Sequence, residues 1–299
     1  MLNLDTLNTD FGINDHVRFV TGAGGFIMLE VKNAHATALI STYSGHVLAY
    51  QPINEPEPLL FLSEQANYEQ GKAIRGGVPV CWPWFSDDGV PAHGFMRNQQ
   101  WHVAATQQQR DGSTKVILNI GHNQHSQEHW AYKFNLQLEI IIGETLSMVL
   151  TSSNLDDTDF TISQALHTYL SVGDVNKIEI IGLDGTHYLD KTTGFGKGEQ
   201  EGNIKIDGEF DRIYGSLQQN ILLRDPVFHR QIRISSPKST TAVIWNPGAE
   251  NSTAMADLAD DAYKQFICIE AANTACDKVV VKAGHSHTLT VNYAVEALI

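Results

Sequence analysis

The stretch 134-FNLQLEIIIGETLSMVLTSSNL-155 is the clearest indication of the fold class of this chain. Apolar and polar residues alternate on both sides of Gly143. A period of two puts one set of side chains on each face of an extended strand, and a glycine between two such runs is a common turn signal. The stretch therefore predicts two antiparallel strands joined by a turn.

Segments of the same kind recur along the chain. Most are bounded by Gly, Asn, Asp or Pro, and they lie at residues 25–33, 36–52, 114–122, 160–172, 178–183, 231–236, 240–247, 265–273 and 286–295. The sequence has neither helical heptads nor the alternating helices of a parallel α/β protein. The spacing between segments is typical of sandwich and barrel folds. We therefore predict an all-β protein.

The chain of 299 residues is predicted to form one domain, residues 1–299. Its length would allow one or two domains, but no Pro/Ser-rich linker or run of charges divides it, and strand-like segments continue to the end. The glycine-rich stretch 192–215 is the longest part without a strand pattern. We expect it to be a long loop, and such a loop in a compact domain is usually functional or mobile.

The formal net charge of -14 excludes the usual polyanionic partners. Nucleic acid phosphates and anionic lipid surfaces are repelled at long range, so we expect neither nucleic acid nor a membrane as a partner. The same charge repels a small anionic substrate. A site for such a substrate has to gather its cations locally, where hydrogen bonds from arginine act at short range.

The compartment is predicted from the first residues and from the cysteines. Residues 1–11 lack the basic start and apolar core of a secretion signal, and no apolar run approaches the roughly 20 residues of a membrane-spanning helix. The cysteines, Cys81, Cys268 and Cys276, are odd in number and lack metal-ligand spacing. We expect a cytoplasmic protein whose reduced cysteines serve packing.

The stretch 75-RGGVPVCWPWF-85 combines two glycines with prolines and aromatic residues. Glycines allow close backbone approach, while the prolines and the aromatic rings stiffen the chain after them, so the segment can hold Arg75, His93 and Arg97 in fixed directions. Aromatic faces suit a sugar ring, and forked arginine donors suit phosphate or carboxylate oxygens. The alternative is a packed corner in which the arginines satisfy backbone carbonyls.

His167 and Glu270 are candidates for proton transfer. His167 lies in a strand pattern, on the face of Ala165 and Tyr169, where a lone histidine is more often structural than catalytic. Glu270 comes after an apolar run, so a buried carboxylate is expected, and such a group needs a partner or its pKa rises. Facing each other across a cavity, the two would form a general acid and base pair. The sequence alone does not place them together.

Six motifs in order carry a resemblance. The motifs "AIRGGVPVCWPWF", "AHGFMRNQQW", "ALHTYLSVGD", "GEFDRIYG", "VIWNPG" and "ICIEAAN" are similar to those of the glucose-6-phosphate 1-epimerase group of the aldose 1-epimerase, or galactose mutarotase-like, family. The likeness runs from about residue 17 to the C-terminus. Each motif alone is modest, but six in one order are specific. The resemblance implies a large antiparallel β-sandwich, called a supersandwich, which agrees with the strand prediction.

The resemblance also implies a reaction, the interconversion of α and β anomers of D-glucose 6-phosphate or another hexose 6-phosphate. His167 would protonate the ring oxygen, and Glu270 would remove the proton from the anomeric hydroxyl. Ring opening, rotation about the C1–C2 bond and closure then give the other anomer. This chemistry implies no cofactor and no metal.

Four further residues match positions that bind substrate in the family. Arg75 and Arg97 would bind the phosphate or neighbouring oxygens, His93 belongs to the "HGF" motif, and Asp211 of the "DR" motif would contact the sugar. The sequence departs from the pattern at "AAN" after the glutamate. Asp87 and Asp88, close to the expected anion site, would oppose phosphate binding if both pointed inward.

Three alternatives stay open at this point. The enzyme could be a mutarotase of unphosphorylated aldoses, for which the two arginines would matter much less. A non-catalytic carbohydrate-binding sandwich would not need both His167 and Glu270. An enzyme acting on polysaccharide fits the acidic, signal-free sequence less well. We expect a small sugar phosphate as the partner and a monomeric protein.

Overall fold

The computed structural model describes residues 3–218 and 220–298. Within these residues the strands form two eight-stranded sheets, one four-stranded sheet and one two-stranded ribbon. The strand neighbours pair antiparallel, as in the hairpin built by the stretch 134–155, in which Ile142 pairs with Leu146. The all-β, antiparallel prediction is confirmed.

The long sheet is the base of the molecule. Its strands, in spatial order, are β13 (Glu179–Ile181), β17 (Ile221–Asp225), β18 (Arg230–Ser235), β22 (Ser286–Ala297), β9 (Leu146–Asn154), β8 (Phe134–Ile142), β7 (Thr114–Gly121) and β6 (His102–Gln108). In β8 and β9 every second side chain is buried. The alternation that is visible in the sequence therefore gives this sheet one face for the core.

Two sheets pack against this base. The N-terminal sheet contains β1 (Val17–Thr21), β2 (Ile27–Lys32), β3 (Ala36–Ser41) and β4 (His46–Pro52). The other, which we call the site sheet, contains β15 (Gly196–Glu199), β14 (His187–Asp190), β16 (Phe210–Tyr214), β19 (Thr241–Asn246), β20 (Phe266–Asn273), β11 (Gln164–Leu166) and β5 (Val80–Cys81), with β12 (Tyr169–Ser171) also paired to β20. The ribbon joins β10 (Phe160–Ile162) to β21 (Val279–Val281).

Helices are short and lie in connections. They are α1 (Leu4–Phe11), α2 (Gln124–His129) and α3 (Gly248–Thr253), together with the single 3₁₀ turns η1 (Ala23–Gly25), η2 (Met96–Asn98), η3 (Lys191–Thr193), η4 (Ala262–Gln265) and η5 (Ala275–Asp277). None of them contributes a layer of its own. Side chains for a site therefore come from the strands of the site sheet and from the connections between strands.

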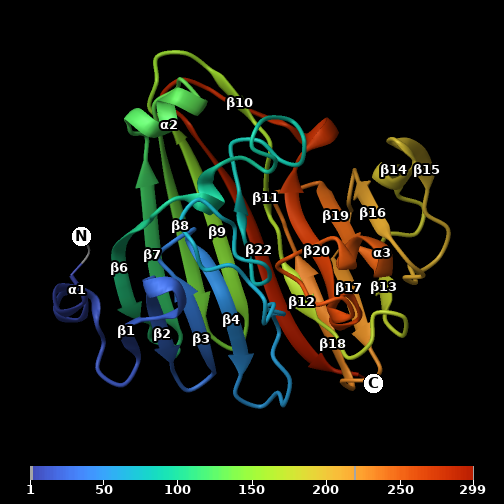
Figure 1. The fold of residues 1–299 in the computed structure, drawn as a ribbon, viewed down its shortest axis with the longest axis horizontal. Coiled ribbons are helices and arrows are strands. Elements are labelled where there is room, and N and C mark those ends of the chain that lie inside the picture. Colours follow the sequence, from blue (N-terminus) through green and yellow to red (C-terminus); the bar gives the residue numbers. More distant parts are fainter. Residues whose placement is uncertain (1–2, 219, 299) are drawn as a thin grey trace.

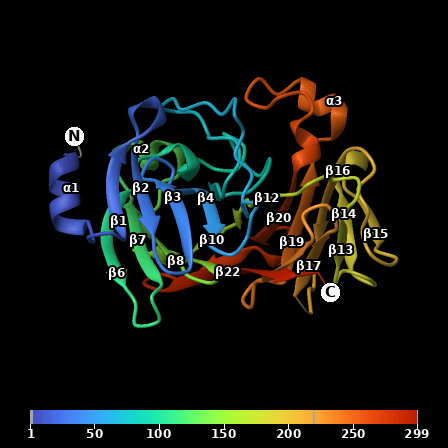
Figure 2. The ribbon, with the colours of Figure 1, turned by 90° about the horizontal axis from the view of Figure 1, so that it is seen from below.

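The core lies between the sheets. Figure 2 shows β1–β4 as a layer over the β6–β8 part of the long sheet, with the site sheet next to it toward the other end, and Figure 1 shows the same order from the side. One hydrophobic cluster includes Phe19 of the N-terminal sheet, Leu138 and Leu289 of the long sheet, and Ile267 and Ile269 of the site sheet. The fold is therefore a sandwich in which the N-terminal sheet and the site sheet both pack on the long sheet.

Every segment that the alternation predicted contains a strand, but the expected loop at 192–215 was wrong. It contains β15 and β16, which complete the site sheet. β15 has the sequence GKGE, and glycine is a poor strand former. Its pairing with β14, four residues opposite four, makes it a strand. β14 is the preceding strand along the chain, but the glycines of β15 leave no alternation of apolar and polar residues from which this hairpin could be predicted.

Candidate active site

Glu270 lies in the middle of β20 and faces away from the main core. Ile269 and Ala271 join that core, so the period of two turns the carboxyl group to the other face of the sheet. The side chain is 1% exposed, and its Oε2 has no hydrogen-bond partner among the described residues. Burial raises the pKa of Glu270 well above 4.5, and the negative charge of Asp211 raises it further. The protonated form is therefore favoured.

His167 lies in the break between β11 and β12. Its backbone N–H donates to the carbonyl of Pro79, and its ring stacks on Tyr169 with centroids 5.0 Å apart. Its Nε2 lies 3.4 Å from Oε1 of Glu270. Burial lowers the pKa of His167 well below 6.5, and nearby positive charges lower it further. The structure thus brings together the two groups that the sequence could not place side by side.

The glycine pair of residues 75–85 lets this segment lie against β4. Gly77 has a φ of +62°, and a Cβ atom at this position would come within 2.3 Å of the carbonyl oxygen of Val47. Any side chain there would collide with the backbone of β4. The close approach holds the backbone next to Arg75 against β4.

The two tryptophans of this segment do not line the pocket. Trp82 is fully buried and donates its indole N–H to Ser152, and Trp84 donates its own to a loop carbonyl. Phe85 is the aromatic residue of the segment that lines the pocket, where Trp245 of β19 joins it. The segment is a packed corner that also supplies one wall of the site.

Arg75 is an arginine whose charge is already compensated. Its Nε and Nη2 contact the two carboxylate oxygens of Asp257, each at 3.2 Å. Its Nη1 donates to the hydroxyl of Tyr169 at 3.0 Å. Asp257 belongs to the connection after α3. Arg75 therefore brings hydrogen-bond donors to the pocket but little net charge.

Arg97 differs from Arg75 in its partners. It lies in η2, and its Nη2 donates to the carbonyl of Ala92 at 3.1 Å. Its Nε is buried without a hydrogen-bond acceptor, and within the described residues no carboxylate lies within ion-pair distance. A guanidinium that has no carboxylate partner and whose Nε lacks an acceptor is suited to bind an anion through charge-assisted hydrogen bonds. Arg97 therefore brings to the pocket a positive charge that no carboxylate of the described residues neutralises.

His93 lies in a turn beside this arginine. Its backbone has a φ of +64°, its N–H donates to the carbonyl of Ser86, and its ring centroid is 5.4 Å from that of His167. Burial lowers the pKa of His93 to about 3, and the charge of Arg97 adds to the effect. The ring is therefore neutral at physiological pH.

Lys191 is a pocket residue that sequence reasoning missed. It comes directly after β14, whose pairing with β16 brings it next to Asp211. Its Nζ lies 3.5 Å from Oδ2 of Asp211 and donates to Oγ of Ser86 at 2.8 Å. Burial raises the pKa of Asp211, and the charge of Lys191 opposes this rise. The sequence around a lysine in a turn does not indicate that it lines a pocket, because its partners come from other elements.

Asp87 and Asp88 do not belong to the residues that line the pocket. The side chain of Asp87 is 77% exposed and lies 3.7 Å from Nζ of Lys191. Asp88 accepts a hydrogen bond from Ser163 and pairs with Lys278 at 3.0 Å. Both charges are solvated or compensated, so the objection to an anion site does not apply.

One pocket gathers all six site residues that the sequence indicated, Arg75, His93, Arg97, His167, Asp211 and Glu270. Its volume of ≈ 260 Å³ is close to the lower limit of about 300 Å³ for ligand pockets, so it fits a small molecule. Within residues 3–218 and 220–298, no group of three or more His, Cys, Asp or Glu side chains comes together to hold a metal ion.

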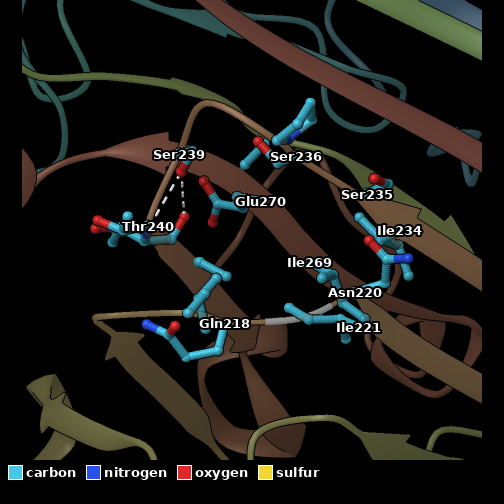
Figure 3. A pocket seen from close by; sticks show the side chains of 15 residues that line it. Gln218, Asn220, Ile221, Ile234, Ser235, Ser236, Ser239, Thr240, Ile269 and Glu270 are labelled. Carbon is cyan, nitrogen blue, oxygen red and sulfur yellow. Dashed lines mark hydrogen bonds between the residues drawn. The ribbon is translucent and has the colours of Figure 1, made fainter.

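A second pocket, drawn in Figure 3, is lined by residues of β17, β18, β19 and β20 and by their connections. Two of its hydroxyl groups are engaged locally, since Oγ of Ser239 donates to the carbonyl of Thr241 and Oγ of Ser236 donates to that of Thr290, whereas the buried hydroxyl of Thr241 has no hydrogen-bond partner among the described residues. Glu270 is the one titratable residue in its described lining, and that carboxyl group contacts His167 of the first pocket. Glu270 thus borders both pockets, and its histidine partner lines the first.

The burial of Glu270 leads to a stability prediction. Between pH 4.5 and the raised folded-state pKa, the folded protein binds more protons than the unfolded chain, so stability falls as the pH rises through this window. Glu270→Gln has no proton to lose. The variant should therefore be more stable than the wild type, by on the order of 1 kcal/mol at the upper end of the window. Thermal unfolding between about pH 4 and pH 9 measures this difference. Identical pH dependence of Tm in the two proteins would contradict it.

The comparisons with known proteins agree with this geometry. The family described as aldose 1-epimerase matches residues 28–294. A protein of Escherichia coli strain K12 named "Putative glucose-6-phosphate 1-epimerase" is 32% identical over 269 residues, which cover 87% of each chain. A protein of Cenchrus ciliaris with the same name is 30% identical over 266 residues, 86% of this chain and 80% of that one.

The fold has a solved relative as well. The crystal structure of "a putative mutarotase (YeaD)" from Salmonella typhimurium superposes with a TM-score of 0.88 and 27% identity, covering 94% of both chains. In the part of the chain that the structure describes, no helix has the length and apolar character needed to cross a membrane. The match over residues 28–294 and the shared sandwich fold lead to one conclusion: the chain belongs to the aldose 1-epimerase family.

Proposed function

We propose that the protein interconverts the α and β anomers of D-glucose 6-phosphate. The observation that carries this proposal is a single pocket in which a buried histidine and glutamate in contact at 3.4 Å share the space with Arg97, an arginine without a carboxylate partner. The pair supports proton transfer at a hemiacetal, and the arginine supports a phosphorylated sugar. The names of the relatives from E. coli and C. ciliaris agree with this substrate.

The closeness of His167 and Glu270 suits the reaction. The ring oxygen and the anomeric hydroxyl of an aldose are bonded to the same carbon, so the acid and the base must also be neighbours. Nε2 of His167 gives a proton to the ring oxygen while the carboxylate of Glu270 takes the hydroxyl proton. The bond between C1 and the ring oxygen breaks, and the electron pair of the O–H bond forms the aldehyde. Rotation about C1–C2 and the reverse proton transfers give the other anomer.

The pKa directions of the pair fit these roles. A neutral His167 with a protonated Glu270 holds the same number of protons as a charged His167 with an ionised Glu270. The two states differ in the position of one proton between Nε2 and Oε1. The reactive state is therefore reached when one proton moves from Oε1 to Nε2, and no proton from solvent is needed. This holds over the pH range in which the number of protons bound by the pair stays constant.

The remaining pocket residues bind different parts of the substrate. Arg97 binds the phosphate, because its charge is uncompensated. Arg75, neutralised by Asp257, donates to sugar oxygens, and His93 and Asp211 contact further sugar oxygens from other walls of the pocket. A non-catalytic binding protein is disfavoured, since it would have no need for a buried glutamate with an unpartnered oxygen, which is costly to fold.

We also propose a cytoplasmic location and a single domain. The three cysteines are free, which suits a reducing compartment. The main hydrophobic cluster contains residues from Leu7 to Tyr293, which suits one folding unit. The monomeric state stays a prediction.

Proton exchange spectroscopy tests the function. Equilibrated glucose 6-phosphate, and separately glucose, is recorded with purified protein, without protein and with the Glu270→Gln variant. Stronger cross-peaks between the α and β anomeric protons for the phosphosugar alone, absent with the variant, are expected. Equal enhancement for both sugars would identify a mutarotase of free aldoses. No enhancement with either sugar would leave the carbohydrate-binding alternative.

A further inference from the structure

The side chain of Cys81 lies directly behind the pocket. It belongs to β5, is 0% exposed and packs among Phe85, Ala165 and Val243. Its Sγ lies 3.6 Å from Nδ1 of His93. Among the described residues this histidine nitrogen is its hydrogen-bond partner. The cysteine that the sequence assigned to packing therefore contacts a residue of the site.

The ring of His93 is held in one orientation. The left-handed backbone at φ +64° and the hydrogen bond from its N–H to Ser86 hold the residue, and the ring meets Phe85 edge to face with centroids 4.9 Å apart. Nδ1 is turned to Cys81, behind the pocket, while the ring itself lines the cavity. The other ring nitrogen, Nε2, is thus left for a ligand.

The chemistry of the contact decides which nitrogen carries the proton. Burial raises the pKa of the Cys81 thiol to about 12, so at physiological pH it keeps its hydrogen. The neutral ring of His93 has one N–H and one lone pair. A thiol is a weak acceptor, whereas an unprotonated imidazole nitrogen is a good one. The favourable arrangement is S–H donating to Nδ1, with the ring proton on Nε2.

We propose that Cys81 is a positioning residue that fixes the tautomer of His93, so that Nε2–H is presented to the pocket as a hydrogen-bond donor. The neighbouring Arg97, Arg75 and Lys191 also present donors to this pocket. A fixed Nε2–H makes His93 another donor for a sugar oxygen, without adding a positive charge. That the acceptor is a sugar oxygen rests on the proposed function; the tautomer itself does not.

Nitrogen NMR of protein labelled with ¹⁵N-histidine tests the tautomer in the absence of any substrate. In the wild type, His93 should show an unprotonated Nδ1 and a protonated Nε2. In Cys81→Ala the donor is lost, and the two shifts should move toward each other as the other tautomer becomes populated. Cys81→Ser keeps a donor and should keep the wild-type tautomer. A protonated Nδ1 in the wild type, or unchanged shifts in Cys81→Ala, would overturn the proposal.

The matched control is the second buried cysteine, Cys268. It is also 0% exposed, but it packs in a different cluster with Phe61, Tyr169 and Phe266. Cys268→Ala removes the same sulfur atom from a buried position, so its effect on Tm measures what the loss of packing alone costs. The nitrogen shifts of His93 should not change in this variant. A change of these shifts in Cys268→Ala equal to that in Cys81→Ala would refute a specific role of Cys81.

Kinetics adds a second readout. Cys81→Ala should lower kcat/KM by about fivefold, the loss of one modest hydrogen bond, and Cys81→Ser should recover most of it. A fall shared equally by both variants, with the wild-type tautomer kept in both, would make the role structural. If the wild type itself shows no epimerase activity, the proposed function fails, while the NMR result still decides the tautomer.

Discussion

Glu270→Gln should lower kcat for the anomerisation of glucose 6-phosphate by about 10²–10⁴-fold, the contribution of a positioned general base. The glutamine fills the same space in β20 but takes no proton from the anomeric hydroxyl. The rate is measured from exchange cross-peaks after the uncatalysed rate has been subtracted. A folded Glu270→Gln protein with the wild-type rate would remove Glu270 from the mechanism.

His167→Ala is the partner experiment. It should cause a loss of similar size, because Nε2 of His167 and Oε1 of Glu270, 3.4 Å apart, act on two oxygens of one carbon. The effects of substituting residues that act as a unit do not add, so the double variant should be only a little slower than either single variant. Losses that multiply in the double variant would mean that the two residues act in separate steps.

Arg97→Met should raise KM for glucose 6-phosphate by roughly 10- to 100-fold, the loss of charge-assisted hydrogen bonds to a phosphate. Free glucose lacks the phosphate, so its KM should change little. The reason is the isolation of this guanidinium, whose Nε is buried without an acceptor. Initial rates over a range of both sugars give the two KM values. A rise of equal size for both would assign Arg97 to the sugar ring and favour a mutarotase of free aldoses.

The matched control removes the other arginine together with its counter-charge. Arg75→Met combined with Asp257→Asn keeps the local charge balance, which a single Arg75 substitution would break by leaving a half-buried carboxylate alone. This pair should affect glucose 6-phosphate and glucose to a similar degree. A selective loss for the phosphosugar, larger than that of Arg97→Met, would move the phosphate to Arg75.

Several features could be predicted because their causes are local. Alternation over 134–155 specifies which face of a strand is apolar, and it predicted the hairpin of β8 and β9. The strand β15 could not be predicted in this way, since its glycines carry no such pattern and its pairing with β14 supplies the order. The two tryptophans of the segment 75–85 mark it as stiff, but their burial depends on the residues that pack around them. For this reason the sequence left open whether the segment lines a sugar site or forms a packed corner.

The amino-acid sequence alone was enough to establish the antiparallel sandwich, the family and the residue types that the chemistry requires. The separate role of each of those residues became clear only from their arrangement in space. Arg75 and its partner Asp257 are 182 residues apart, and the contacts of Cys81 with His93 and of Lys191 with Asp211 likewise join different elements. Charge compensation, tautomer and pKa depend on distances of a few ångströms between such elements. These distances are set by sheet pairing and burial, which no local pattern of residues encodes.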